Sequence, residues 1–179
     1  MNLELTHYPA DILKKSAAPV EEINDSIVEL IDKMTDIMFA NHGCGLAAPQ
    51  AGVALRLFII SMPAVRNPGL TPDPNDLGSD SVKVFINPTV TGIGKIEAND
   101  EGCLSVPNIC TKIRRHSQCK VTATGLDGKE FTEEADGLYA RVLQHEYDHI
   151  NGMIIVDRMT AAAKIVNRKK LKKLAEEYN

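Results

Sequence analysis

The stretch DGLYARVLQHEYDHING, residues 136–152, predicts a helix that carries a cluster of potential metal ligands. Apolar residues and histidines recur at helical spacing along one stripe of it, which consists of Leu138, Val142, His145 and His149. Asp136 is a candidate cap for the start of this helix, and Gly152 can end it. We therefore expect one helix here, with the rest of the fold arranged around it.

His145 and His149 are separated by about one helical turn, so both imidazoles project from one face and can bind one metal ion. The carboxylate of Glu146, which lies between them, can reach a water molecule on that ion. The simpler alternative is two ordinary helix histidines, one packed and one exposed, beside a solvated acid. The predicted cap and apolar stripe of the helix favour the metal site.

A catalytic site of this kind needs a third protein ligand and an open position for water. No histidine follows His149, and Ile155 stands where a metzincin would carry its third histidine. Upstream, Cys103 follows Gly102, which lets the backbone bring the sulfur close to a facing helix. A small buried hydrophobe is the usual interpretation of a lone cysteine, but the missing third ligand favours Cys103 as a metal ligand.

The remaining sequence predicts an α+β fold with antiparallel sheets packed around the central metal-binding helix, plus an amino-terminal helix and a carboxyl-terminal helix. The expected elements are a helix from about Ile27 to Gly43, strands over 53–60 and 82–86, a hairpin of 120–125 and 129–133 around Asp127-Gly128, and a helix from about Thr160 with Ile165, Leu171 and Leu174 as its apolar side. The Pro- and Gly-rich stretch 63–80 is expected to be a surface loop without an assigned function. Residues 1–179 are expected to form a single catalytic domain.

Composition argues against several classes of protein. The 179 residues include 20 Lys and Arg against 24 Asp and Glu, a net charge of −4, so nucleic acid is not an expected substrate. The apolar runs are too short to cross a membrane, and the amino terminus has no signal segment. We expect a cytoplasmic protein, unless a transit segment was removed. The four cysteines lack CxxC spacing, which favours free thiols or a metal ligand over disulfides.

Three blocks of the sequence resemble the motifs of the peptide deformylase family. They are GCGLAAPQ at 43–50, EGCLS at 101–105 and QHEYDH at 144–149, and their order and separations also agree with the family. The resemblance covers most of the chain. It implies a hydrolase that removes the N-formyl group from the initiator methionine of new polypeptides and releases formate, with an N-formylmethionyl peptide as substrate.

The resemblance also implies roles for residues in these blocks. Cys103, His145 and His149 would hold one divalent ion, and Glu146 would take a proton from the metal-bound water and later pass it to the leaving amine. Ferrous iron is the ion expected from the family, while zinc, nickel or cobalt can occupy the site in a purified sample. The ligand set alone suits zinc equally well.

Substrate-binding roles follow from the same resemblance. The side-chain amide of Gln50, which taken alone would be a turn residue, and the backbone N–H of Leu104 would stabilise the oxyanion. Backbone groups of Cys44 and Gly45 would pair with the extended peptide as an added strand. The apolar slot for the methionine side chain would be lined by Leu138 and Val142, for which core packing is the alternative.

Two positions depart from the family's pattern. Arg141 stands where some relatives carry an apolar residue, so it either alters the pocket wall or points to solvent. Cys110 stands where several bacterial relatives carry an arginine near the peptide backbone. Candidate substitutes for that arginine are Arg114 and Arg115.

Other functions remain open at this point. A zinc endopeptidase would use the same helix, although the missing downstream ligand argues against it. A metal-free binding protein or inactive relative is a further alternative, against which the intact motifs argue. The basic stretch 168–173 is interpreted as a solvated helix face, with contact to the ribosome exit region as the alternative by analogy with the family. A monomer is expected.

Overall fold

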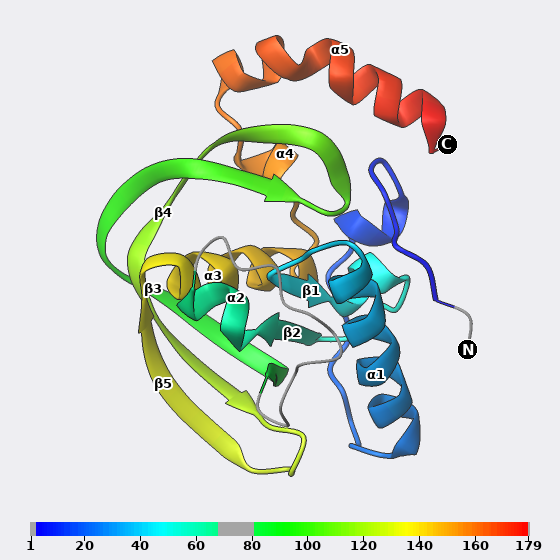
Figure 1. The fold of residues 1–179 in the computed structure, drawn as a ribbon, viewed down its shortest axis with the longest axis vertical. Helices are drawn as coiled ribbons and strands as arrows, with labels where there is room; N and C mark the ends of the chain where they lie inside the picture. The colour runs from blue at the N-terminus through cyan, green and yellow to red at the C-terminus, as the bar shows by residue number, and fades with distance from the viewer. Residues whose placement is uncertain (1–2, 68–80, 179) are drawn as a thin grey trace.

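The computed structural model describes residues 3–67 and 81–178, and α3 lies at the centre of the fold with the strands arching around it (Figure 1). The helices are α1 (Asp25–Ala40), α2 (Met62–Arg66), α3 (Gly137–Ile150), α4 (Ile155–Arg158) and α5 (Ala161–Glu177), with short 3-10 turns η1 (Asp11–Lys14) and η2 (Ala48–Ala51). The strands are β1 (Gly45–Ala47), β2 (Leu57–Ser61), β3 (Val82–Cys103), β4 (Val106–Thr124) and β5 (Glu130–Asp136).

The five strands form one sheet in the order β1-β2-β3-β4-β5, and each neighbouring pair is antiparallel. The predicted α+β class is therefore confirmed, with the antiparallel strands gathered in a single sheet. The predicted hairpin around Asp127-Gly128 is also confirmed: β4 and β5 pair from Thr124↔Glu130 onward, and Gly128 takes a φ of 77° in the turn.

The central helix α3 packs its apolar face on the sheet. Leu143 and Ile150 are fully buried in one core cluster with Phe58 and Phe85, whose rings stack on each other. The predicted side-chain cap at Asp136 is wrong, because this residue is the last of β5 and its side chain makes no capping hydrogen bond.

Gly152 follows the central helix, as predicted, with a φ of 73°. A Cβ atom there would lie 2.7 Å from the carbonyl oxygen of Lys14, so the glycine also permits a close approach of the amino-terminal segment.

The amino-terminal helix α1 begins at Asp25, two residues before the expected Ile27, because the side chain of Asn24 caps it by accepting hydrogen bonds from the backbone N–H groups of Ser26 and Ile27. It ends at Ala40, slightly before the expected Gly43. Its apolar face packs against β1 and β2 in a second core cluster, with buried residues that include Leu30, Met34, Met38, Leu46 and Ile59.

Three predicted boundaries are wrong. The strand expected over 53–60 begins only at Leu57, and the strand expected over 82–86 continues to Cys103, because the polar residues after 87 pair along β4 with little apolar patterning. The loop expected over 63–80 begins with α2, which Ser61 caps; its remainder, 68–80, lies outside the described residues.

The carboxyl-terminal helix α5 lies across the outer side of β4 (Figure 1). It begins at Ala161, directly after its N-cap Thr160, which agrees with the predicted start at about Thr160. Its expected apolar side is only partly right. Leu174 is buried, but Ile165 is 75% exposed. Among the described residues, no helix is long and apolar enough to span a membrane.

Candidate metal centre

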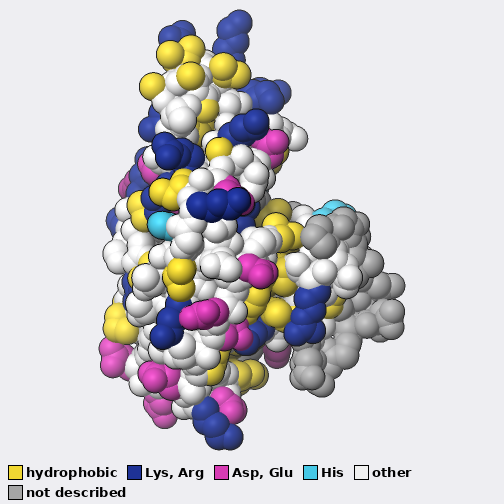
Figure 2. Space-filling view, turned by 90° about the vertical axis from the view of Figure 1, so that its left-hand side faces the viewer, with side chains coloured by type: hydrophobic (Ala, Val, Ile, Leu, Met, Phe, Trp, Pro, Cys, Tyr) yellow, Lys and Arg dark blue, Asp and Glu magenta, His cyan; other side chains and the backbone are white. Residues whose placement is uncertain are grey.

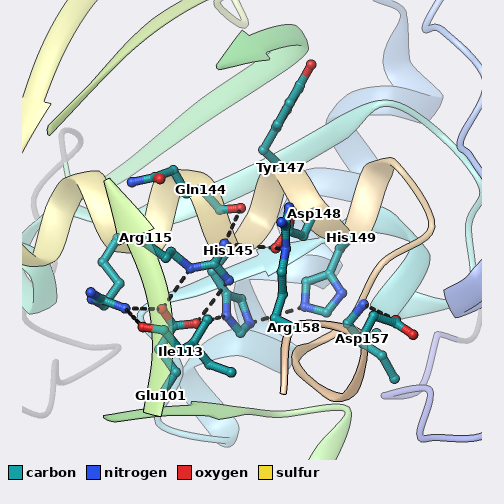
Figure 3. A network of polar contacts seen from close by, with 12 residues as sticks. Glu101, Ile113, Arg115, Gln144, His145, Tyr147, Asp148, His149, Asp157 and Arg158 are labelled. Atoms are coloured by element: carbon teal, nitrogen blue, oxygen red, sulfur yellow. Dashed lines mark hydrogen bonds and ion pairs between the residues drawn. The ribbon is translucent and has the colours of Figure 1, made fainter. Parts of the chain in front are cut away.

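Three side chains converge beneath α3. The sulfur of Cys103 lies 3.4 Å from Nε2 of His149, and that nitrogen lies 3.2 Å from Nε2 of His145. Both histidines point to the same side of α3, while Tyr147 points to the other (Figure 3). Cys103 reaches them because it ends β3 at a register shift in the pairing with β4. The structure therefore brings together the three residues predicted as metal ligands.

This arrangement fits a metal ion. Ligand bonds of about 2.0–2.3 Å around a tetrahedral ion separate the ligand atoms by roughly 3.3–3.6 Å, and the two separations above are close to that range. The three ligand atoms all lie within 4.8 Å of one another. In the described part of the structure, buried Oε2 of Glu146 and Nδ1 of His149 have no hydrogen-bond partner. Two polar atoms beside the cluster are therefore available to a ligand or a water molecule.

A buried carboxylate orients the first histidine. Glu101 lies 3.0 Å from Nδ1 of His145, so Nε2 of that ring is left to face the other ligands. Arg115 contacts both oxygens of Glu101, at 2.7 and 3.0 Å, and Arg141 contacts one of them at 2.6 Å. Burial by itself would raise the pKa of Glu101, but the hydrogen bonds from His145 and Arg115 lower it to about 2.

The ion-pair network continues along α3 to Asp148. Arg115 also donates to Asp148 at 2.8 Å, and Arg158 contacts the same carboxylate through Nε at 3.0 Å (Figure 3). Glu101 and Asp148 are therefore each held by two or more cationic partners. Sequence reasoning missed this network, although an acid two residues before Cys103 and an acid next to His149 were available as signals.

The two histidines differ electrostatically. Burial would lower the pKa of His145, but its hydrogen bonds to Cys103 and Glu101 raise it well above the ordinary value. For His149, burial and then the neighbouring positive charge of His145 lower the pKa. The surroundings thus favour the charged form of His145 and the neutral form of His149.

Glu146 lies against the first sequence block. Burial raises the pKa of Glu146 to about 7, against the opposing charges of His145 and Arg115. A Cβ atom added to Gly45 would lie 2.7 Å from Oε1 of Glu146. Glycine at position 45 is thus required for the backbone of β1 to approach this carboxylate.

Gln50 is fixed beside the ligand cysteine. Its Oε1 accepts a hydrogen bond of 2.8 Å from the backbone N–H of Ala47, and its Nε2 lies 3.3 Å from Oγ of Ser105 and 3.7 Å from Sγ of Cys103. Ser105 is fully buried, and sequence reasoning did not single it out as a partner of Gln50. Leu104, next to the cysteine, is half-buried.

A cleft of about 970 Å³ opens beside these groups. Its lining includes all the predicted site residues except His149, namely Cys44, Gly45, Gln50, Cys103, Leu104, Leu138, Val142, His145 and Glu146. Leu138 and Val142 also pack against the main core cluster. Both interpretations of these two residues, cleft wall and core packing, therefore hold.

The structure shows the surroundings of the positions that depart from the family's pattern. Arg141 is buried and paired with Glu101, so it does not point to solvent. Arg115 is committed to the ion-pair network along α3, and Arg114 lines a separate cavity of about 320 Å³, so neither takes the place of an arginine at 110. Cys110 itself is exposed and lines the cleft.

Comparisons with known proteins agree with this geometry. A family model described as polypeptide deformylase matches residues 2–164. The chain is 38% identical over 171 residues to the peptide deformylase of Thermodesulfovibrio yellowstonii, a match that covers 95% of this chain and 96% of that relative. It is 37% identical over 165 residues to the peptide deformylase of Thermotoga maritima, covering 92% and 91% of the two chains.

Solved structures show the same fold. A peptide deformylase from Plasmodium falciparum superposes with a TM-score of 0.87 at 30% identity, covering 98% of this chain and 96% of that one. A peptide deformylase from Legionella pneumophila superposes with a TM-score of 0.83 at 34% identity, covering 97% and 95%. The similarity therefore includes nearly the whole chain.

Proposed function

The chain belongs to the peptide deformylase family, whose enzymes remove the N-formyl group from nascent polypeptides, and on that premise we propose how its own residues perform the reaction. Residues 1–179 would act as a single catalytic domain. The observation that carries the proposal is the convergence of Cys103, His145 and His149 beside buried Glu146. When bound there, a divalent ion supplies an acidified water molecule and polarises the formyl carbonyl.

Glu146 is proposed as the general base and then the general acid. It is 3% exposed, and its Oε2 has no partner among the described residues, so this oxygen is available to accept a proton from water. The same carboxyl group would then deliver the proton to the amine that leaves when formate is released. The close backbone of Gly45 limits where its side chain can move.

Gln50 and Leu104 are proposed to stabilise the oxyanion. The hydrogen bond from Ala47 holds Oε1 of Gln50, which leaves Nε2 directed toward the side of Cys103. A preorganised N–H donor at such a position stabilises developing negative charge without reorganising in the transition state. The backbone N–H of Leu104 would be the second donor.

The substrate backbone is proposed to pair with β1. This three-residue strand is the first in the sheet order, and within residues 3–67 and 81–178 it pairs with β2 alone, so its other edge can receive an extended peptide. Gly45 begins the strand, and Cys44 precedes it. Leu138 and Val142 would then contact the methionine side chain from α3, in the cleft that they already line.

Ferrous iron is proposed as the physiological ion, and zinc, nickel or cobalt as ions that can occupy the same residues. A thiolate and two imidazoles bind any of these ions. A ferrous ion bound to a thiolate would be sensitive to oxidation, so the protein should be purified and loaded with iron without oxygen.

The direct test is to incubate iron-loaded protein with formyl-Met-Ala-Ser under anaerobic conditions and to measure formate and free amine together. Equal release of both is the expected result. An intact peptide would contradict the proposed function. Cleavage of an internal peptide bond would instead support an endopeptidase that uses the same helix.

A further inference from the structure

One end of the cleft is built from three parts of the chain that are distant in sequence. His7 comes from the amino-terminal segment, Lys170 and Tyr178 from α5 or its end, and Asn108 and Cys110 from β4, and all five line the cleft. The rings of His7 and Tyr178 stack with their centroids 4.1 Å apart and their planes 17° apart. This stack joins the end of α5 to the amino-terminal segment, so the helix end is held at the cleft.

One face of α5 packs on the body of the protein. Asn167 and Leu174 are 7% and 6% exposed, and Leu174 belongs to a core cluster that also contains Cys103 and Ile109. By helical spacing, Lys170 lies on this packed face, one turn from each of those two buried residues.

The opposite face of α5 is solvated. Lys169 and Ile165 lie about half a turn away from the packed face; Lys169 is exposed, and Ile165 is 75% exposed. Figure 2 shows this end of the molecule protruding, with Lys, Arg and hydrophobic side chains side by side on its surface. The helix thus separates one lysine at the cleft from the other basic residues, which face solvent.

Lys170 is the one lysine among the described residues that line the cleft. The other long basic side chain in the lining, Arg141, is buried and bound to Glu101 at 2.6 Å. Burial lowers the pKa of His7, against the opposing charge of Glu177, which disfavours the charged form of its ring. Asp100 also lines the cleft, but no ion pair joins it to Lys170 in the described structure.

A single hydrogen bond holds the ammonium group of Lys170 and leaves other N–H donors of that group unused. It donates one hydrogen bond of 3.2 Å to the backbone carbonyl oxygen of Asn108. An ammonium group has three N–H donors, so two remain for a ligand in the cleft. A carboxylate is the group that such a partly used, exposed ammonium would attract most strongly.

We propose that Lys170 recognises a carboxylate on the substrate peptide downstream of the formylmethionine, and so makes the enzyme favour acidic amino-terminal sequences. The proposal rests on the proposed function, because it assumes that the cleft holds a formylated peptide. The carboxylate can be an acidic side chain or the terminal carboxylate of a short peptide. It would pair with the exposed lysine without touching the reacting atoms, so it should lower KM and leave kcat unchanged.

The experiment uses iron-loaded full-length protein and amidated formyl-Met hexapeptides in which a single Glu is moved through positions two to six. Each Glu peptide is matched by a Gln peptide. We expect KM for the Glu peptide to be about two- to five-fold lower at one or two neighbouring positions, the size of an exposed ion pair. The preference should shrink at high salt. A short unamidated Gln peptide tests the terminal carboxylate separately.

Matched variants assign the preference to one side chain. Lys170→Ala should abolish the Glu-to-Gln ratio and Lys170→Glu should reverse it, while Lys169→Ala, on the solvated face, should keep the wild-type ratio. Turnover of the Gln peptides controls for folding. If wild-type protein releases no formate from any peptide, the proposed function fails. If it is active but shows no preference at any position, or if Lys170→Ala keeps the preference, this inference is overturned.

Discussion

The buried acids around the metal-binding helix are of two kinds. Glu101 and Asp148 are buried and are paired with arginines. Glu146 is equally buried, yet one of its oxygens has no partner in the described residues. Paired charges fix the positions of ligands, whereas an unpaired buried charge remains available for proton transfer. Substitution of the unpaired acid should therefore reduce turnover, whereas substitution of a paired acid should reduce metal affinity and stability.

The largest effect on turnover is expected at the unpaired acid, Glu146. Glu146→Gln should keep the fold and the metal but lose turnover by at least about 10²–10⁴-fold, because it removes the acid–base group. Formate release and metal content per chain are the measurements. Near-normal turnover with bound metal would contradict the role assigned to this residue.

Loss of a paired acid should instead weaken metal binding and lower the stability of the fold. Glu101→Gln removes the charge that orients His145 and leaves Arg115 and Arg141 buried without their shared partner. We expect metal affinity to fall by about 10–100-fold and the free energy of unfolding to fall by about 3 kcal/mol. Metal titration and denaturant unfolding measure the two effects. Unchanged values for both would show that the network does not support the site.

The contact between the two sequence blocks can be tested without changing a polar group. In Gly45→Ala, the new methyl group would lie 2.7 Å from Oε1 of Glu146 and displace that carboxyl group. We expect turnover to fall by roughly ten- to a hundred-fold, since such displacements are costly in active sites, with the metal retained.

The neighbouring change Gly102→Ala is the control for that clash. Its new methyl group would meet nothing closer than 3.8 Å, so metal content and folding should stay near wild type. An equal loss of turnover in both variants would show that the crowding of Glu146 is not the cause.

The smallest effects concern the two faces of α5. Leu174→Ala removes a side chain that is 6% exposed and should destabilise the protein by about 2 kcal/mol. Ile165→Ala changes a side chain that is 75% exposed and should shift the free energy of unfolding by less than about 0.5 kcal/mol. Thermal or denaturant unfolding compares the pair. Equal destabilisation by both changes would contradict the assignment of the packed face.

The sequence predicts local patterns better than long-range partners. The spacing of His145 and His149 and the Asp127-Gly128 turn both act over a few residues, and the predicted helix and hairpin are both present. The length of β3 could not be predicted, because its polar outer part is stabilised by pairing with β4 and not by an apolar face of its own.

The charged residues around the site show the same limit. Arg115 and Arg141 are common surface residues by type, and only the fold brings both against Glu101. The apolar side expected for α5 is wrong at Ile165 for a local reason: Ile165 is nine residues from Leu174, which is about half a turn around the helix, so it lies on the opposite face and is 75% exposed. The contacts of Arg115 and Arg141, in contrast, depend on which distant strand or helix each side chain reaches in the folded protein.

The most direct test of the central claim is X-ray absorption spectroscopy of anaerobically iron-loaded protein, comparing wild type with Cys103→Ala. The account predicts one ion per chain whose nearest shell contains one sulfur and at least two imidazole nitrogens in wild type. It also predicts loss of the sulfur signal, with much weaker iron binding, in the variant. A wild-type shell without sulfur, or an unchanged spectrum in the variant, would contradict the assignment of Cys103, His145 and His149 as the metal ligands.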